Sequence, residues 1–460
     1  MSRSRSVSER LADFCVGLQA GDFPAYVVED ARWRLVDTIG CAAAGARLEH
    51  ARAVGEVAFE QGGATESTVI GSDRRLPAPL AGFLNTIYAH GPDYDDTHSV
   101  AMVHMSAVAV ISTLVMGERE GIDGSRFLTA MVAGAELGVR VAALVPHIFH
   151  KHNFHATGIV GPFCSATIGS LVLGLDAERL ANALGVAGSL AAGLRQGNLD
   201  GSWVKRVHPA WGVQNGLLAA LFCERGFTGP REIFEGPWGL YKVYLHREPG
   251  IDPERLLEGL GADWLYPQST YKPFPNGAWN HASMDAVAIA MRQGGIGFEN
   301  VERVDVRVPP QCIPIVCEPR PARLSPASPY HMKFSLQYSV AMLAVLGHAG
   351  VDDYSAEVLA NRRIADFAAR VFCEGDESMS PEGFPAQVVV HTRDGRQLTC
   401  DMPAQRGGPG NPKSPDDHRA KFRANASGTL GEARSEQLLA ALESLWDAPD
   451  LSAVTSAMTS

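Results

Sequence analysis

The chain has 460 residues, of which 46% are hydrophobic and 20% are charged, as is typical of a globular protein. This length predicts two domains rather than one. The 40 Lys and Arg residues against 51 Asp and Glu residues give a net charge of −11, which, with no basic stripe in the sequence, argues against binding of nucleic acid. A local pair of cations such as Lys205-Arg206 can still attract an anionic ligand.

The N-terminal segment and the cysteines predict a cytoplasmic protein. No apolar run follows Met1-Ser-Arg-Ser-Arg, so we expect no signal peptide. The 8 cysteines are scattered without a Cys-x-x-Cys pair, which is typical of buried thiols in a reducing compartment. The longest uncharged stretch, 152–175, contains Pro162 and several glycines, so we interpret it as a buried helix and expect no membrane span.

Residues 1–265 predict a large helical domain. In the segment 25–39, Val28, Leu35 and Ile39 recur along one face, as in an amphipathic helix. Further helices, apolar nearly all round and therefore central in a bundle, are expected around 106–116, 125–144, 164–174, 178–194 and 209–226.

Residues 266–405 predict a smaller α+β domain. The segment 301–308 alternates as a strand, and Asp394-Gly395 within 387–400 predicts the turn of a β-hairpin. Helical patterns at 281–293, 334–347 and 364–371 lie between these strands. Helical spacing returns at 415–424 and 432–446, so we expect residues 406–460 to return to the helical domain. The predicted fold is therefore mainly α, with a large all-helical domain and a smaller α+β lid domain.

Three acids lie close together in the segment from His90 to His98, namely Asp93, Asp95 and Asp96. Such carboxylates repel one another unless something compensates their charge. One interpretation is a solvated turn in which Asp96 or Thr97 caps the next helix. The other is a metal site, but there is no His-Glu-x-x-His motif and the spacing matches no regular cation loop, so we predict no metal.

Other polar residues stand at the start of apolar segments or within them. His155 opens an apolar helical stretch, and a histidine there is either structural or catalytic. Lys205 lies among aromatic and aliphatic neighbours, where a lysine either extends to solvent or holds a substrate carboxylate. Together these types supply the base, the acid and the cations that proton transfer at a carbon next to a carboxylate needs.

Several of these motifs, in this order, resemble the MmgE/PrpD family, which includes 2-methylcitrate dehydratase, cis-aconitate decarboxylase and iminodisuccinate epimerase. The matching segments span nearly the whole chain: 36–45, 90–98, 155–158, 201–209, 228–236, 272–281, 333–338, 411–414 and 421–422.

The resemblance implies a homodimer of two-domain chains, an active site in the cleft between the domains, and catalysis without metal or other cofactor. It also implies the site residues. The catalytic candidates are Asp93, His104, His155 and Lys205. The substrate-binding candidates are Thr97, Arg206, Lys272 and His281.

The chain departs from the family pattern at three places. Decarboxylases of the family carry a catalytic histidine where this chain has Gly277, His104 is followed by Met105 rather than proline, and an arginine common before Phe154-His155 is replaced. These departures argue against decarboxylation of cis-aconitate.

We therefore expect a dehydratase-type lyase acting on a di- or tricarboxylic acid. The alternatives are an epimerase or racemase, a decarboxylase, and a non-catalytic family member. In the expected mechanism Lys205 and Lys272 bind substrate carboxylates, and His155 or His104 moves the proton. Asp93 orients that histidine.

Overall fold

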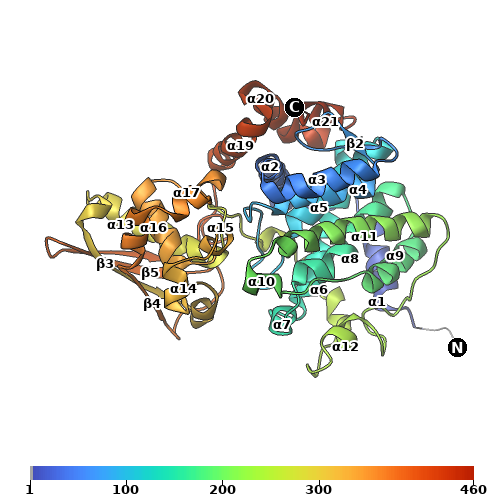
Figure 1. The fold of residues 1–460 in the computed structure, drawn as a ribbon. Coiled ribbons are helices and arrows are strands. Elements are labelled where there is room, and N and C mark those ends of the chain that lie inside the picture. The colour runs from blue at the N-terminus through green and yellow to red at the C-terminus, as the bar shows by residue number, and fades with distance from the viewer. Residues whose placement is uncertain (1–3, 460) are drawn as a thin grey trace. The chain divides into compact units, whose positions relative to one another are not determined.

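The computed structural model describes residues 4–459 (Figure 1). The chain divides into two compact units, one formed by the residues up to Ser269 together with those from Ser414 onward, and the other by Thr270–Lys413. The first unit is almost entirely helical and the second contains a four-stranded sheet with helices. The predicted fold class, mainly α with a smaller α+β part, is confirmed.

The first unit is built mostly of helices, and most of them follow the expected apolar segments. In chain order they are α1 (Val7–Gly17), α2 (Ala25–Gly45), α3 (Glu49–Gln61), α4 (Ala78–His90), α5 (Met105–Glu120), α6 (Gly124–Ala143), α7 (Ile148–Lys151), α8 (Ala156–Leu173), α9 (Ala177–Ser189), α10 (Gly197–Asp200), α11 (Val207–Glu224), α12 (Leu240–Tyr244), α19 (Pro415–Leu430), α20 (Glu432–Glu443) and α21 (Ser452–Ala457). A short hairpin, β1 (Ser67–Thr68) and β2 (Arg75–Leu76), was not expected.

Helix α8 begins well before the expected segment 164–174 and contains Pro162 in its interior. Proline has no N–H to donate to the carbonyl four residues earlier, which is that of Gly158. In the structure this carbonyl accepts a hydrogen bond from the backbone N–H of Ala192 (3.4 Å). The chain that follows α9 therefore satisfies the group that proline leaves open.

Glycines bring α8 and α11 close together at the centre of the unit (Figure 1). A Cβ on Gly216 would lie 2.4 Å from the carbonyl oxygen of Pro162, and one on Gly212 would lie 3.1 Å from the Cα of Gly161. Farther along, Gly169 faces Ala220, so the two helices run parallel. Parallel packing brings their N-terminal ends to the same side of the unit.

Helix α8 is also, within residues 4–459, the one helix long and apolar enough to cross a membrane by length and composition. Of this apolar helix 89% is buried inside the fold, so its hydrophobic character is that of a core helix.

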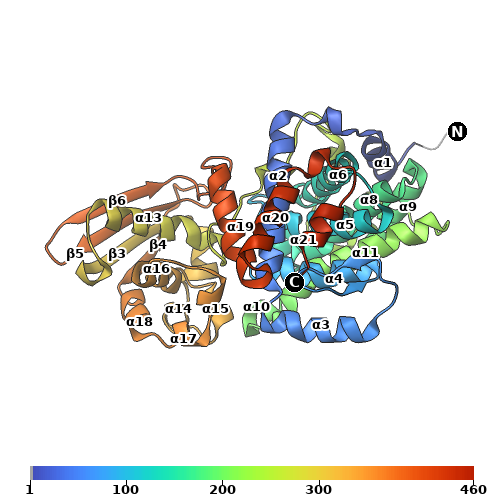
Figure 2. The same cartoon turned by 90° about the horizontal axis from the view of Figure 1, so that it is seen from above.

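The C-terminal segment packs against α2 through α19 (Figure 2). Lys421 forms a buried ion pair with Asp37 (Nζ–Oδ1 2.8 Å) and donates to the carbonyl oxygen of Tyr94 (2.8 Å). Gly40 lets Phe422 approach, because a Cβ on Gly40 would lie 3.1 Å from the Phe422 ring. These contacts fix the loop that follows α4, which carries the three acids.

The second unit holds a sheet of strand order β4-β3-β5-β6. Its elements are α13 (His281–Gln293), β3 (Val301–Val308), α14 (Arg320–Leu324), α15 (Pro329–Met332), α16 (Leu336–Leu346), α17 (Ala356–Leu359), α18 (Arg362–Ala368), β4 (Val371–Gly375), β5 (Ala386–Thr392) and β6 (Gln397–Met402). The expected strand is β3, and β5–β6 is the expected hairpin, whose turn contains Gly395 at φ +85°. The helix expected at 364–371 ends earlier, because Val371 begins β4, which pairs parallel with β3.

Candidate active site

Three long helices of the first unit begin next to candidate residues. His104 immediately precedes α5, His155 precedes α8, and Lys205-Arg206 precede α11. The ring centroids of His104 and His155 are 5.8 Å apart, and that of His208, in the first turn of α11, is 5.2 Å from His155. The N-terminus of a helix carries a partial positive charge, so these ends together favour an anionic ligand.

His90, at the C-terminal end of α4, joins His104 and His155 in a buried cluster. The centroid of the His90 ring lies 4.9 Å from that of His104 and 5.9 Å from that of His155. One ring nitrogen from each of the three residues lies within 4.8 Å of the other two. His90 was not among the site residues expected from the sequence, although it opens the segment that carries the three acids.

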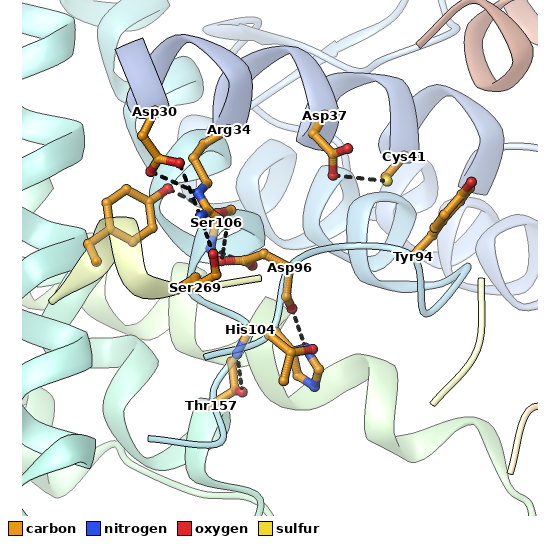
Figure 3. Close-up of polar contacts among 12 residues, drawn as sticks. Asp30, Arg34, Asp37, Cys41, Tyr94, Asp96, His104, Ser106, Thr157 and Ser269 are labelled. Carbon is orange, nitrogen blue, oxygen red and sulfur yellow. Dashed lines mark hydrogen bonds and ion pairs between the residues drawn. The ribbon is translucent and has the colours of Figure 1, made fainter. Parts of the chain in front are cut away.

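The tautomer of His104 follows from its contacts (Figure 3). Its Nδ1 lies 2.7 Å from the backbone carbonyl oxygen of Asp96 and 3.2 Å from Thr97 Oγ1, and its backbone N–H donates to Thr157 Oγ1 (3.0 Å). A carbonyl oxygen only accepts hydrogen bonds, so Nδ1 carries the proton in the neutral ring. Nε2 is then the basic nitrogen. Thr97, expected to bind substrate, here contacts the His104 ring.

His155 is held by another imidazole. Its Nδ1 lies 3.1 Å from His208 Nδ1, so one of the two rings donates and the other accepts. Burial lowers the pKa of His155 well below its ordinary value, and the nearby His208 and Lys205 lower it further. His155 is therefore neutral near pH 7, as a base requires. The expected orienting residue was Asp93, but the contact that holds His155 comes from His208, three residues after Lys205 in the motif.

The three acids are buried, so the interpretation as a solvated turn was wrong. Asp93 pairs with Lys205 (Oδ2–Nζ 2.9 Å), and Asp95 pairs with His90 (Oδ2–Nδ1 2.7 Å). Asp93 and Asp95 thus each have a positively charged or ionisable partner, which offsets the repulsion between the carboxylates.

The third acid, Asp96, does act as a helix cap. Its Oδ1 accepts from the backbone N–H of Ser106 (3.1 Å) in the first turn of α5, and its Oδ2 faces Arg34 at 3.3 Å (Figure 3). Burial raises the pKa of Asp96 to about 6, although Arg34 opposes the shift. The same residue therefore anchors α5 through its side chain and His104 through its backbone.

Three residues beside the site have backbone angles in the left-handed region: Asp93 (φ 59°), Met102 (φ 55°) and Asn153 (φ 64°). Such conformations are tolerated in Asp and Asn and cost more in Met. Strain of this kind gathers at functional sites because the surrounding structure must hold it. Here the strained residues flank the turns that deliver the acids, His104 and His155.

The remaining candidates lie in two places. Arg206 is buried and its Nε donates to the carbonyl oxygen of Gly91 (3.2 Å), which ties the start of α11 to the loop after α4. Lys272 and His281 belong to the second unit, where both are buried; His281 begins α13, with its ring 5.9 Å from that of Phe274. A role for Lys272 and His281 in substrate binding stays a prediction.

The three clustered histidine nitrogens also lie close enough to hold a metal ion. We expect activity to survive exhaustive chelation, because proton transfer between imidazole rings and a carbon acid needs no ion. The measurement is turnover after dialysis against a chelator, with the metal content determined in parallel. Loss of turnover that a divalent ion restores contradicts this expectation.

Buried neutral histidines predict loss of stability in acid. Burial lowers the pKa of His98 and of His208 to about 4, and lowers that of His155 well below its ordinary value. The unfolded chain, with a histidine pKa of about 6.5, then binds more protons below that pH, so stability falls by up to about 1.4 kcal/mol per group and pH unit. Burial raises the pKa values of the Asp96 and Glu136 carboxyl groups, which opposes this effect. We expect a lower urea midpoint at pH 5 than at pH 7; an equal or higher midpoint is the contrary result.

Comparison with known proteins gives matches along most of the chain. The family model of the MmgE/PrpD N-terminal domain matches residues 9–251, and that of the MmgE/PrpD C-terminal domain matches residues 274–447. The chain is 24% identical to a cis-aconitate decarboxylase-like protein, oryM, of Aspergillus oryzae, over 97% of this chain and 96% of that protein. It is also 24% identical to the cis-aconitate decarboxylase of Homo sapiens, over 98% and 94%, and 28% identical to that of Aspergillus terreus, over 56% and 54%.

Proposed function

The chain belongs to the MmgE/PrpD family, and we propose that it is a metal-independent lyase that moves a proton at the carbon next to a carboxylate of a di- or tricarboxylic acid. A lyase-type enzyme is what the cis-aconitate decarboxylase relatives support. The observation that carries the proposal is that His104, His155 and Lys205 stand at three helix N-termini, with His90 clustered beside the two histidines.

This arrangement suits the chemistry of a carbon acid. Removing a proton next to a carboxylate places a second negative charge on that group. Lys205 and the partial positive charges of the helix ends stabilise such charge in a buried site, where electrostatic interactions are strong. Nε2 of His104, the nitrogen that carries no proton in the neutral ring, and the neutral His155 are the two bases available to take the proton.

We propose dehydration as the reaction, on the evidence of Gly277. Its N–H donates to the carbonyl oxygen of Lys333 (2.9 Å), and a Cβ at this position would lie 3.3 Å from that oxygen and 3.4 Å from the Phe334 ring. A side chain at position 277 would therefore lie tightly against the carbonyl oxygen of Lys333 and in contact with the Phe334 ring. The local packing supports a reaction that does not use a histidine there.

Decarboxylation is the second candidate, because the relatives named above are cis-aconitate decarboxylases or resemble one. An epimerase would need two bases on opposite faces of one carbon, and the clustered histidines leave that alternative open as well.

The test is proton NMR in D₂O with a panel of di- and tricarboxylic acids, chosen first by thermal shift. A ligand at 100 times its Kd adds about 2.7 kcal/mol of apparent stability. A new olefinic signal from a hydroxy acid supports dehydration. Release of carbon dioxide supports the second candidate, and deuterium uptake with inversion alone indicates an epimerase. No change with any acid contradicts the proposed function.

The expected homodimer is also a proposal, supported by exposed aromatic residues on α11. Trp211 and Phe222 lie three turns apart on one side of this helix and are 45% and 44% exposed, which is unusual for residues of this size. We expect the double substitution Trp211→Arg/Phe222→Arg to convert a dimer to a monomer in light scattering. Trp238→Arg, at an 89% exposed position, is the matched control and should leave the mass unchanged. A wild-type monomer contradicts the proposal.

A further inference from the structure

His90 and Asp95 form a buried pair that the expected mechanism does not use. His90 Nδ1 lies 2.7 Å from Asp95 Oδ2, and the side chains are 1% and 0% exposed. The other ring nitrogen, Nε2, is buried and has no hydrogen-bond partner among the described residues. A buried imidazole with one nitrogen paired to a carboxylate and the other left open is equipped to exchange a proton with a ligand.

We infer that His90 is the proton donor of the proposed reaction and that Asp95 is its positioning residue. This inference rests on the proposed function and assigns different roles to the clustered histidines. His90 supplies a proton, and His104 or His155 removes one.

The three rings differ in what they face. His90 faces a carboxylate, so an imidazolium formed there is an ion pair at hydrogen-bonding distance. His104 Nδ1 faces the carbonyl oxygen of Asp96 and the hydroxyl of Thr97, and His155 faces a second imidazole. An imidazole with one nitrogen on a carboxylate and the other open is placed to give a proton to a ligand. On this geometry His90 is the acid.

The backbone holds this pair in place. The N–H of Asp93 donates to the carbonyl oxygen of His90 (3.0 Å), and that of Gly91 donates to Ile87 (2.9 Å), so the loop turns back on the last turn of α4. Asp93 has the left-handed backbone angle in this turn, at φ 59°. The strained turn thus returns Asp95 to the histidine five residues earlier.

In dehydration every proton and electron pair has a donor and an acceptor. The base takes the proton from carbon, the electron pair of that C–H bond forms the double bond, and the C–O bond to the hydroxyl group breaks. The leaving oxygen takes the proton from His90 Nε2 and departs as water, which leaves His90 neutral. Return of the base's proton to His90 through solvent resets the site. In decarboxylation the same proton goes to the carbon that loses carbon dioxide.

The decisive variant is His90→Asn. Its side-chain amide keeps an N–H donor toward Asp95, so the buried carboxylate keeps a partner, while Nε2 is removed. We expect net turnover to fall by roughly 10²–10⁴-fold, with deuterium exchange at the carbon next to the carboxylate within about threefold of wild type. Exchange needs only the base, whereas net turnover also needs the acid. If His90 had a merely structural role, His90→Asn would lower exchange and turnover alike.

Asp95→Asn tests the positioning role. The amide oxygen still accepts from His90 Nδ1, so the tautomer is kept and only the charge is lost. We expect kcat to fall with KM nearly unchanged, and exchange to persist. The matched control is His98→Asn, in the same loop. His98 is buried and its Nδ1 accepts from the N–H of Ala101 (3.1 Å), which an asparagine oxygen can also do. The His98→Asn variant should keep the wild-type rates of turnover and of deuterium exchange, and thermal melting checks that it is folded.

Three results overturn the assignment or its premise, and they are distinguishable. Turnover of His90→Asn near the wild-type value shows that His90 is not the donor. Equal losses of turnover and exchange in a folded His90→Asn show that it is not a separate acid. A wild-type enzyme inactive on every acid contradicts the proposed function itself, before any variant is made, and the donor role with it.

Discussion

Lys205→Met is expected to lower kcat/KM by roughly 10²–10³-fold on the true substrate, the usual effect of removing one preorganised electrostatic group. Lys205 is buried at the start of α11, 2.9 Å from Asp93, and its charge adds to the positive helix ends around it. Methionine keeps most of the side-chain volume and removes the charge. The measurement is steady-state kinetics on the acid identified by NMR.

The same substitution has a second expected effect, on stability. The pair with Asp93 is buried, and breaking a buried ion pair costs about 3–5 kcal/mol. The double variant Asp93→Asn/Lys205→Met should recover part of this loss without recovering activity.

A matched control separates stability from catalysis. Arg140→Met breaks a buried ion pair on α6, with Glu136 (2.7 Å), and should lower the melting temperature with a much smaller effect on kcat/KM. If Lys205→Met keeps near-normal kcat/KM, Lys205 does not anchor the substrate carboxylate.

His155→Asn is expected to lower proton exchange by roughly 10²–10⁴-fold, the contribution of one placed base. Asparagine retains a polar group toward His208 and removes the second ring nitrogen. Because His155 is neutral well below pH 7, the loss should be the same from pH 6 to pH 8. Deuterium uptake at each pH measures it.

The partner of His155 gives the control for this prediction. His208→Asn should lower exchange less than His155→Asn does, because His208 acts through the 3.1 Å contact between the two Nδ1 atoms. The double variant should be little worse than His155→Asn alone, since residues that act as a unit are not additive. If the loss of exchange in the double variant equals the product of the two single losses, His155 and His208 do not act as a unit. If His155→Asn exchanges at the wild-type rate, the base is not His155, and His104 is the next candidate.

Local sequence determined the elements that a periodic pattern encodes. Alternation in 301–308 and Asp394-Gly395 predicted β3 and the β5–β6 hairpin, and 281–293 predicted α13. Local pattern failed where a distant contact decides. The short strand β4 is stabilised by pairing with β3, nearly 70 residues earlier, and the interior proline of α8 is tolerated because Ala192 satisfies the open carbonyl.

The sequence by itself determined the family, through motifs in a fixed order, and the residue types of the site, because acids, histidines and a lysine stand in those motifs. Only the tertiary structure decided which of them meet. Asp93 and Lys205 lie 112 residues apart in the chain, and His155 and His208 lie 53 apart. His155 and His208 meet because glycines let α8 and α11 pack in parallel, so that both helix starts reach one place. Asp93 meets Lys205 because Arg206 ties the loop after α4 to the start of α11. No local pattern specifies such a contact, since it depends on how two distant helices pack together.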